Sequence, residues 1–225
     1  MTYTYGEAFG VQRKIPKRLA MDVFKKRAGD YDAWYEKRPD LYQSELRAVS
    51  KIGCIGGVEI GVGTGRFAAP LGLRAGVDPV REMLRLAPRE LDLVEGVGEL
   101  LPIRAGAYPC ALIVVTLCFV KSPEAVLREA ARIAPRVVAC IVPRESPWGR
   151  LYLQLGARGH PFYSKAKFYT VAEVVKMAQG LAPARVVATL FNPPPGGGIE
   201  EPVEATVEEA EGAGFACIEF KRRGI

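Results

Sequence analysis

Two acidic residues and three glycines form the cluster in this chain that is best suited to binding a small ligand. Glu59 closes an apolar run, and Gly61, Gly63 and Gly65 follow at every second position. Because glycine has no Cβ, a turn of this kind lets the backbone approach a ligand closely. A helical pattern begins after the turn, so the free N–H groups of that helix would point into the same space. The pattern predicts a strand, a binding turn and a helix start.

A second acid, Asp78, ends the next short apolar segment, 17 positions (78 − 61) after Gly61. At a strand tip beside the glycine turn, the two oxygens of this carboxylate can accept hydrogen bonds from both hydroxyls of a ribose. The alternative is that Asp78 only caps the helix expected over 80–87. For the glycines, the corresponding alternative is a tight turn that holds no ligand.

The glycine spacing argues against a nicotinamide cofactor. A dinucleotide fingerprint has its third glycine five residues after the first, whereas Gly65 comes only four (65 − 61) after Gly61 and is followed by Arg66. The Glu-x-Gly-x-Gly-x-Gly pattern instead resembles motif I of the class I S-adenosylmethionine (SAM) methyltransferases. Asp78 is similar to the acid of their motif II.

The loop Val97-Gly98-Glu99-Leu100-Leu101-Pro102 narrows this resemblance. It resembles the adenine-side loop of the ubiquinone-biosynthesis-like (methyltransferase type 11) small-molecule enzymes, although position 97 is Val where many relatives have a polar residue. The similarity extends over about residues 20–223 and implies SAM as the cofactor. The cofactor-binding residues that it implies are Tyr31, Glu59, Gly61, Gly63, Gly65, Asp78, Pro79, Met83, Gly98, Glu99, Thr116 and Leu117.

Strand and helix patterns alternate along the chain with short connections, which is typical of a doubly wound α/β sheet. The continuous apolar run 111–115 fits a central parallel strand buried on both faces, and residues 116–120 are expected to be its carboxyl end. We expect further strands at 55–60, 75–79, 91–96, 137–143, 184–191 and 215–220, and helices at 16–27, 39–51, 67–71 and 80–87. The resemblance implies a mostly parallel, seven-stranded Rossmann-like sheet with an antiparallel last strand, in a single domain over 1–225.

Two segments outside the sheet are candidates for the acceptor site. Residues 1–50 are expected to form N-terminal cap helices, and residues 144–169, rich in aromatic and cationic side chains, to form a helical insertion that acts as a substrate lid. The alternatives are aromatic residues that only attach the first helices, and an insertion that only packs on the domain edge. Within or beside these segments the candidate substrate residues are Tyr35, Cys118, Arg144 and Tyr163.

Composition excludes several other functions. Five cysteines without a C-x-x-C pair, and a single histidine, His160, argue against a zinc site. No apolar run approaches the length of a membrane span, and the first residues lack a signal-peptide pattern, so we expect a cytoplasmic protein. Scarce amides hint at a thermophilic source, where an internal disulfide is not excluded. Cys118 fits a core residue better than a nucleophile, and His160 a loop residue better than a general base.

The resulting hypothesis is methyl transfer from SAM to a small-molecule acceptor by direct displacement, in a monomer or homodimer, with no catalytic base identified. The net charge of +6 permits an RNA or protein acceptor through Arg144, Arg150, Lys165 and Lys167. A non-catalytic SAM-binding protein is the third reading.

Overall fold

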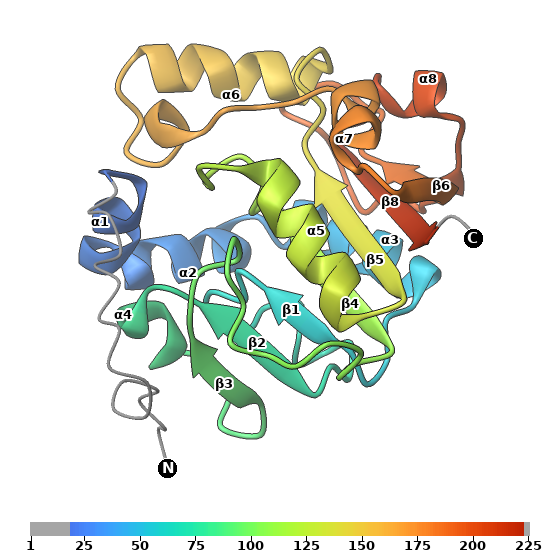
Figure 1. Ribbon diagram of the computed structural model, residues 1–225. Helices are drawn as coiled ribbons and strands as arrows, with labels where there is room; N and C mark the ends of the chain where they lie inside the picture. The colour runs from blue at the N-terminus through green and yellow to red at the C-terminus, as the bar shows by residue number, and fades with distance from the viewer. Residues whose placement is uncertain (1–18, 223–225) are drawn as a thin grey trace.

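The computed structural model describes residues 19–222, which form one mixed sheet with helices on both faces (Figure 1). The strand order is β3-β2-β1-β4-β5-β8-β6-β7. Strands β1 to β5 pair in parallel, whereas β8 lies antiparallel between β5 and β6. The strands are β1 Val58–Ile60, β2 Ala75–Asp78, β3 Asp92–Glu95, β4 Cys110–Val114, β5 Arg136–Ile141, β6 Leu181–Thr189, β7 Val203–Glu204 and β8 Phe215–Arg222.

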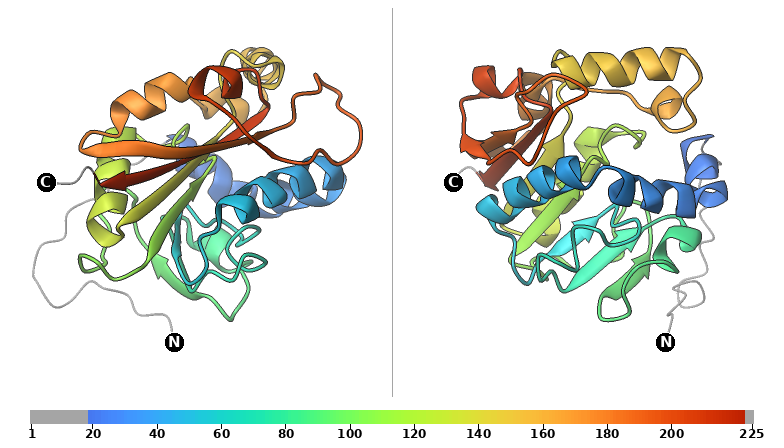
Figure 2. Two further views of the ribbon diagram at one scale, coloured as in Figure 1. Left: turned by 90° about the vertical axis from the view of Figure 1, so that its right-hand side faces the viewer. Right: turned by 180° about the vertical axis from the view of Figure 1, so that it is seen from behind.

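Helices cover both faces of the sheet. Helix α5 crosses the near face in Figure 1, while α3 runs across the opposite face, which the right-hand view of Figure 2 shows from behind. The helices are α1 Leu19–Lys26, α2 Ala28–Lys37, α3 Pro39–Ile52, α4 Arg81–Leu84, α5 Pro123–Ile133, α6 Pro147–Ala157, the 3₁₀ turn η1 Tyr163–Lys165, α7 Val171–Met177 and α8 Val207–Ala210. The predicted doubly wound architecture is therefore confirmed.

Alternate residues of the central strand build two separate cores. In β4, Ala111 and Ile113 pack on the side of α5 and α7, while Cys110, Leu112 and Val114 pack on the side of α3. Successive side chains of a strand point to opposite faces, so a continuous apolar run fills both cores at once. Because β1 pairs in parallel with both β2 and β4, the carboxyl ends of these three strands lie side by side at one edge of the sheet.

Three local expectations need correction. The described sheet has eight strands rather than seven, because the two-residue β7 adds an edge antiparallel to β6. Residues 67–71 form turns rather than a helix, since Pro70 and Gly72 allow only short local hydrogen bonds there. Strand β4 ends at Val114, and residues 116–120 form a loop.

Two helices begin at caps formed by their own local sequence. The Ser122 hydroxyl accepts from the Ala125 N–H at the start of α5, followed by Pro123. Thr170 and Glu173 form the capping box of α7. The predicted insertion after β5 folds as α6 and η1, and the described part of the predicted cap is α1 to α3. Residues 1–18 of that cap lie outside the described residues.

Four of the five cysteines are paired. Cys54 is bonded to Cys110, and Cys140 is bonded to Cys217, while Cys118 is a free thiol. Both disulfides lie in the core on the α3 side of the sheet. The apolar setting of these residues indicated burial, but their pairing depends on strand neighbours that are distant in sequence.

Candidate active site

The glycine turn after β1 is held in a conformation that favours glycine. Gly61, Gly63 and Gly65 all have positive φ, of 77°, 55° and 78°. A Cβ on Gly61 would lie 2.3 Å from the Thr116 hydroxyl, so the turns after β1 and β4 touch. A Cβ on Gly63 would lie 3.2 Å from the Met83 methyl group. The turn is therefore shaped by close approach at Gly61 and Gly65 and by backbone conformation at all three glycines.

Asp78 joins the glycine turn to the start of α4. Its two carboxylate oxygens accept from the Gly63 N–H at 3.0 Å and the Val80 N–H at 2.8 Å. Burial raises the pKa of Asp78 to about 6, although these two N–H groups favour the ionised form. Each oxygen keeps a lone pair for a further donor. Asp78 thus fixes the glycine turn to the residue that precedes α4 and also presents a carboxylate to the adjacent cavity.

This first cavity lies outside the carboxyl ends of the parallel strands, where open α/β sheets bind ligands. Its lining consists of Met21, Phe24, Tyr31, Ile60, Gly61, Gly63, Asp78, Pro79, Val80, Met83, Val97, Gly98, Glu99, Val114, Val115, Thr116, Phe119 and Val120. All predicted cofactor residues except Glu59, Gly65 and Leu117 are in this lining. The Glu99 side chain accepts from the Lys121 and Ser122 N–H groups, which ties the loop after β3 to the start of α5.

The three exceptions have other positions. Leu117 is fully buried in the core beside α5. Gly65 packs against the chain before β3, where a Cβ would lie 2.8 Å from Pro88. Glu59 is buried beneath the turn with a pKa raised well above its usual range by desolvation, and it accepts from the Ala68 N–H. Its Oε2 has no hydrogen-bond partner among the described residues, so a donor is missing there.

A second cavity of about 400 Å³ adjoins the first. Tyr31, Val115 and Phe119 line both. The remaining walls come from α2, α3, α6, the segment around η1 and the turn after β4, and consist of Arg27, Asp30, Trp34, Tyr35, Lys37, Glu45, Cys118, Val142, Tyr152, His160, Pro161, Phe162, Tyr163 and Phe168. The two predicted outer segments, the cap and the insertion, thus meet over one aromatic cavity.

Val115 stands at the boundary of the two cavities with φ at 47°. This is a strained conformation for a β-branched residue, with a typical cost of about 1–3 kcal/mol. Its N–H donates to the Cys140 carbonyl, which holds it against β5. Such strain is concentrated at functional sites in folded proteins. The junction of the two cavities therefore includes a residue held in a strained backbone conformation.

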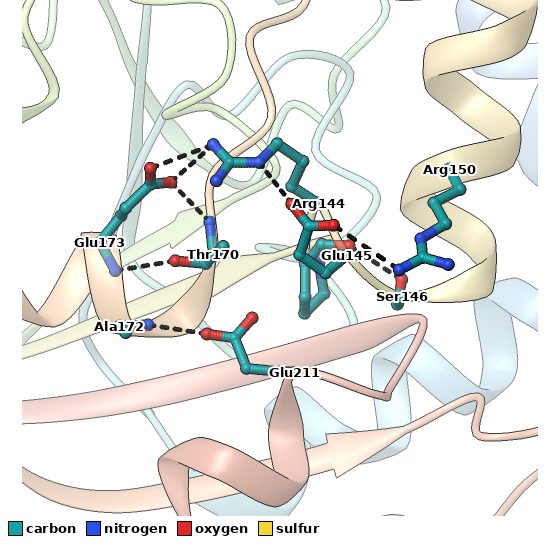
Figure 3. A network of polar contacts seen from close by, with 9 residues as sticks. Arg144, Glu145, Ser146, Arg150, Thr170, Ala172, Glu173 and Glu211 are labelled. Atoms are coloured by element: carbon teal, nitrogen blue, oxygen red, sulfur yellow. Dashed lines mark hydrogen bonds and ion pairs between the residues drawn. The ribbon is translucent and has the colours of Figure 1, made fainter.

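Three of the four predicted substrate residues line the second cavity, and Arg144 does not. Its guanidinium donates to both Glu173 oxygens at 3.0 and 2.9 Å and to Glu145 at 3.0 Å (Figure 3). Arg144 thus ties the end of β5 to α7 and lies outside the lining of the second cavity. Cys118 does face the cavity, but burial raises the pKa of its thiol to about 12, which disfavours a thiolate nucleophile.

Sequence reasoning did not assign several residues of this cavity to the acceptor site. His160 lines it and stacks on Tyr163, with ring centres 4.2 Å apart. Glu45 was overlooked entirely, although a signal was present. It lies four positions after Leu41 and four before Val49 (45 − 41 and 49 − 45), so an acid occupies the buried stripe of an amphipathic helix.

Comparison with known proteins agrees with this geometry. A family model described as a methyltransferase domain matches residues 58–137, which contain the glycine turn and Asp78. An uncharacterised Mycobacterium tuberculosis protein is 40% identical over 85% of this chain and 70% of its own length. A crystal structure from Thermotoga maritima, described as a SAM-dependent methyltransferase and possible histamine N-methyltransferase, is 35% identical over 90% of this chain and 99% of that one, with a TM-score of 0.82. The chain belongs to the SAM-dependent methyltransferases.

The methyltransferase uses SAM as its methyl donor, and the first cavity has features that suit it. Asp78 offers oxygens for hydroxyl groups, and the turn at Gly61 and Gly63 leaves room for a ligand against the backbone. Across residues 19–222, no helix is long and apolar enough to cross a membrane. The same residues contain no group of three or more His, Cys, Asp or Glu side chains that could hold a metal ion.

Proposed function

We propose that this methyltransferase transfers the methyl group of SAM to a small molecule held in the aromatic second cavity. The observation that carries the proposal is the contact between the two cavities at Tyr31, Val115 and Phe119. A donor in the first cavity and an acceptor in the second would meet at this boundary. Alignment and exclusion of water are what direct displacement requires.

The first cavity suggests how the cofactor would be held. Asp78 would accept from the ribose hydroxyls, while the turn at Gly61 and Gly63 would let the rest of the cofactor lie against the backbone. Met83 and the chain at Gly98 would pack against the adenine. We propose that Glu59 supports the turn from beneath rather than from the cavity wall, because it lies outside the lining.

The volume of the second cavity and the pairing of nearby cationic side chains favour a small molecule over RNA or a protein. About 400 Å³ is in the usual range for small-ligand sites. The cationic cluster that permitted an RNA acceptor is partly occupied by protein groups: Arg144 and Arg150 lie beside Glu145, and Lys167 lies over the Tyr169 ring. The Thermotoga maritima relative, described as a possible histamine N-methyltransferase, also favours a small acceptor.

The chemistry needs little from the protein beyond positioning. When bound, SAM supplies an electrophilic methyl group: the acceptor's lone pair forms the new bond to carbon, the S–C electron pair stays on sulfur, and the acceptor's proton leaves to solvent or a base. Tyr31 and Phe119 would close the boundary against water. His160, whose pKa is lowered by burial, is available in neutral form to take a proton.

Titration calorimetry with SAM, S-adenosylhomocysteine (SAH) and NAD tests the cofactor site. Gly63→Ala should weaken SAM binding, because its Cβ would press on Met83 beside the cavity. Gly106→Ala is a matched control, since Gly106 also has positive φ, 65°, but its Cβ would meet nothing within 4 Å. Equal losses of SAM affinity in the two variants would mean that backbone strain at any positive-φ glycine lowers the affinity, and that contact at Gly63 is not the cause.

Release of SAH with candidate acceptors tests the second half of the reaction. We expect low-molecular-weight acceptors to support turnover and bulk tRNA or protein fractions not to. Turnover with tRNA alone, falling steeply as salt is added, would instead favour a nucleic-acid acceptor. A cytoplasmic location and a monomeric or dimeric state remain part of the proposal.

A further inference from the structure

Glu45 is the most unusual charged residue of the second cavity. It projects from α3 into the lining and is only 7% exposed. Within residues 19–222 its side chain makes no hydrogen bond or ion pair, and burial alone raises the pKa of its carboxyl group. A buried carboxylate without a partner is costly, so native proteins normally pair such a group. The missing partner is therefore expected from outside the protein.

Four tyrosines line the same cavity as Glu45. The Tyr31, Tyr35, Tyr152 and Tyr163 side chains are all close enough to interact with it electrostatically. Tyr152 and Tyr163 stack with ring centres 4.4 Å apart. Aromatic faces attract cations, and the attraction is stronger where water is excluded. A carboxylate within an aromatic wall thus forms a site for a desolvated cation.

The protein's own cations do not fill this role. Arg27 and Lys37 also line the cavity but are exposed, which places them at its rim, and Arg27 lies 3.5 Å from Asp30. Glu45 ionises in this apolar setting only when a cation compensates its charge, and an anionic acceptor would offer no such compensation. A neutral acceptor would leave the carboxyl group without a partner. A positively charged acceptor satisfies both the carboxylate and the aromatic wall.

We infer that the acceptor is a small organic amine that binds in its ammonium form, with its nitrogen paired to Glu45 and its carbon skeleton packed among Tyr35, Tyr152 and Tyr163. Glu45 would then be a specificity-determining residue, which selects amines over alcohols and acids of the same shape. This inference rests on the proposed function and names the acceptor class for the same site. It does not require that the paired nitrogen be the one that receives the methyl group.

The test uses three aromatic amines, phenethylamine, tryptamine and histamine, each with its matching alcohol and carboxylic acid. Binding is measured by calorimetry on the full chain saturated with SAH, and turnover by SAH release from SAM. At least one amine should bind roughly 10- to 100-fold more tightly than its alcohol, the range expected for a charge-assisted hydrogen bond in a desolvated site. Alcohols or acids that bind as well as every amine would overturn the inference.

Glu45→Gln should remove this preference while leaving the Kd for SAH unchanged. Glu36→Gln is the matched control, because Glu36 carries the same group on α2, exposed and paired with Arg66. If the Glu45→Gln variant does not fold, the amine-to-alcohol ratio of the natural chain still decides the question. Turnover of alcohols or acids with no amine preference would reject the amine but keep a small acceptor. Turnover only with tRNA or protein would reject the proposed function itself.

Discussion

Glu45 should make the ligand-free protein less stable as pH rises. Burial raises the pKa of its carboxyl group from the usual 4.5 to about 8. Between these two pH values the folded chain holds a proton that the unfolded chain has lost, so unfolding becomes easier as pH increases. At about 1.4 kcal/mol for each pH unit, the full effect is on the order of 5 kcal/mol, of which about 4 kcal/mol falls between pH 5 and pH 9.

Glu45→Gln removes this ionisation and should abolish that part of the pH dependence. Other groups, such as Asp78 with its pKa near 6 and Glu59, destabilise in the same direction, so the natural chain and the variant must be compared at each pH. The Tyr31, Tyr35, Tyr152 and Tyr163 hydroxyls that face Glu45 all have raised pKa values and stay neutral over this range. The cost of burying the glutamine amide of the variant does not depend on pH, so it cancels when the change in stability between two pH values is compared.

The assay is urea unfolding at pH 5 and pH 9, followed by fluorescence, with Glu36→Gln as the control. The natural chain and the control should lose about 4 kcal/mol more than the Glu45→Gln variant over this interval. The same loss in the Glu45→Gln variant as in the natural chain would refute the view that Glu45 is buried without a partner. Saturation with an amine that pairs with Glu45 should also reduce the loss in the natural chain, because the pairing lowers the pKa of Glu45.

Three further changes test other parts of the structure. Asp78→Asn should weaken SAM binding by about 10-fold or more through loss of a charge-assisted acceptor, as measured by calorimetry. Asp92→Asn is the control: Asp92 forms an exposed ion pair with Arg74, and its replacement should leave the Kd for SAM unchanged. Arg144→Ala should leave SAM affinity and turnover within about twofold and cost less than about 1 kcal/mol in unfolding experiments, because its ion pairs are largely solvated; a large loss of turnover would return it to the acceptor site. Unfolding without reductant should expose one reactive thiol, that of Cys118, whereas five reactive thiols would contradict both disulfide pairings. Reduction should lower the melting temperature, because each disulfide contributes roughly 2–4 kcal/mol to the free energy of unfolding.

Local patterns were sufficient where a feature depends on neighbouring residues. The glycine turn and Asp78 could be placed from spacing alone, because a strand, a turn and a helix cap each involve only a few consecutive residues. The caps at Ser122 and Thr170 were predictable for the same reason. The prediction of a helix over 67–71 was wrong because Pro70 and Gly72 interrupt a weak apolar pattern. The predicted position of the carboxyl end of β4 was wrong because an apolar run does not mark where the chain turns.

The second cavity shows what patterns of neighbouring residues in the sequence cannot predict. Arg144 and Tyr163 belong to the same predicted lid, yet one is paired with Glu173 and the other lines the cavity. No local pattern separates them, because the difference depends on how α6 and η1 pack against α2 and α3. The pairing of the cysteines likewise depends on contacts across 56 and 77 positions of sequence.

The sequence by itself determined the methyl-donor half of this protein: a glycine turn and an acid at adjacent strand tips, together with the alternation of strands and helices that brings them to one edge. Only the tertiary structure decided the other half. It brought Glu45 from α3 into an aromatic cavity built by α2, α6 and η1, and it joined that cavity to the first at Tyr31, Val115 and Phe119. A buried, unpartnered charge is defined by what surrounds it, and these surroundings come from segments that are far apart in the chain.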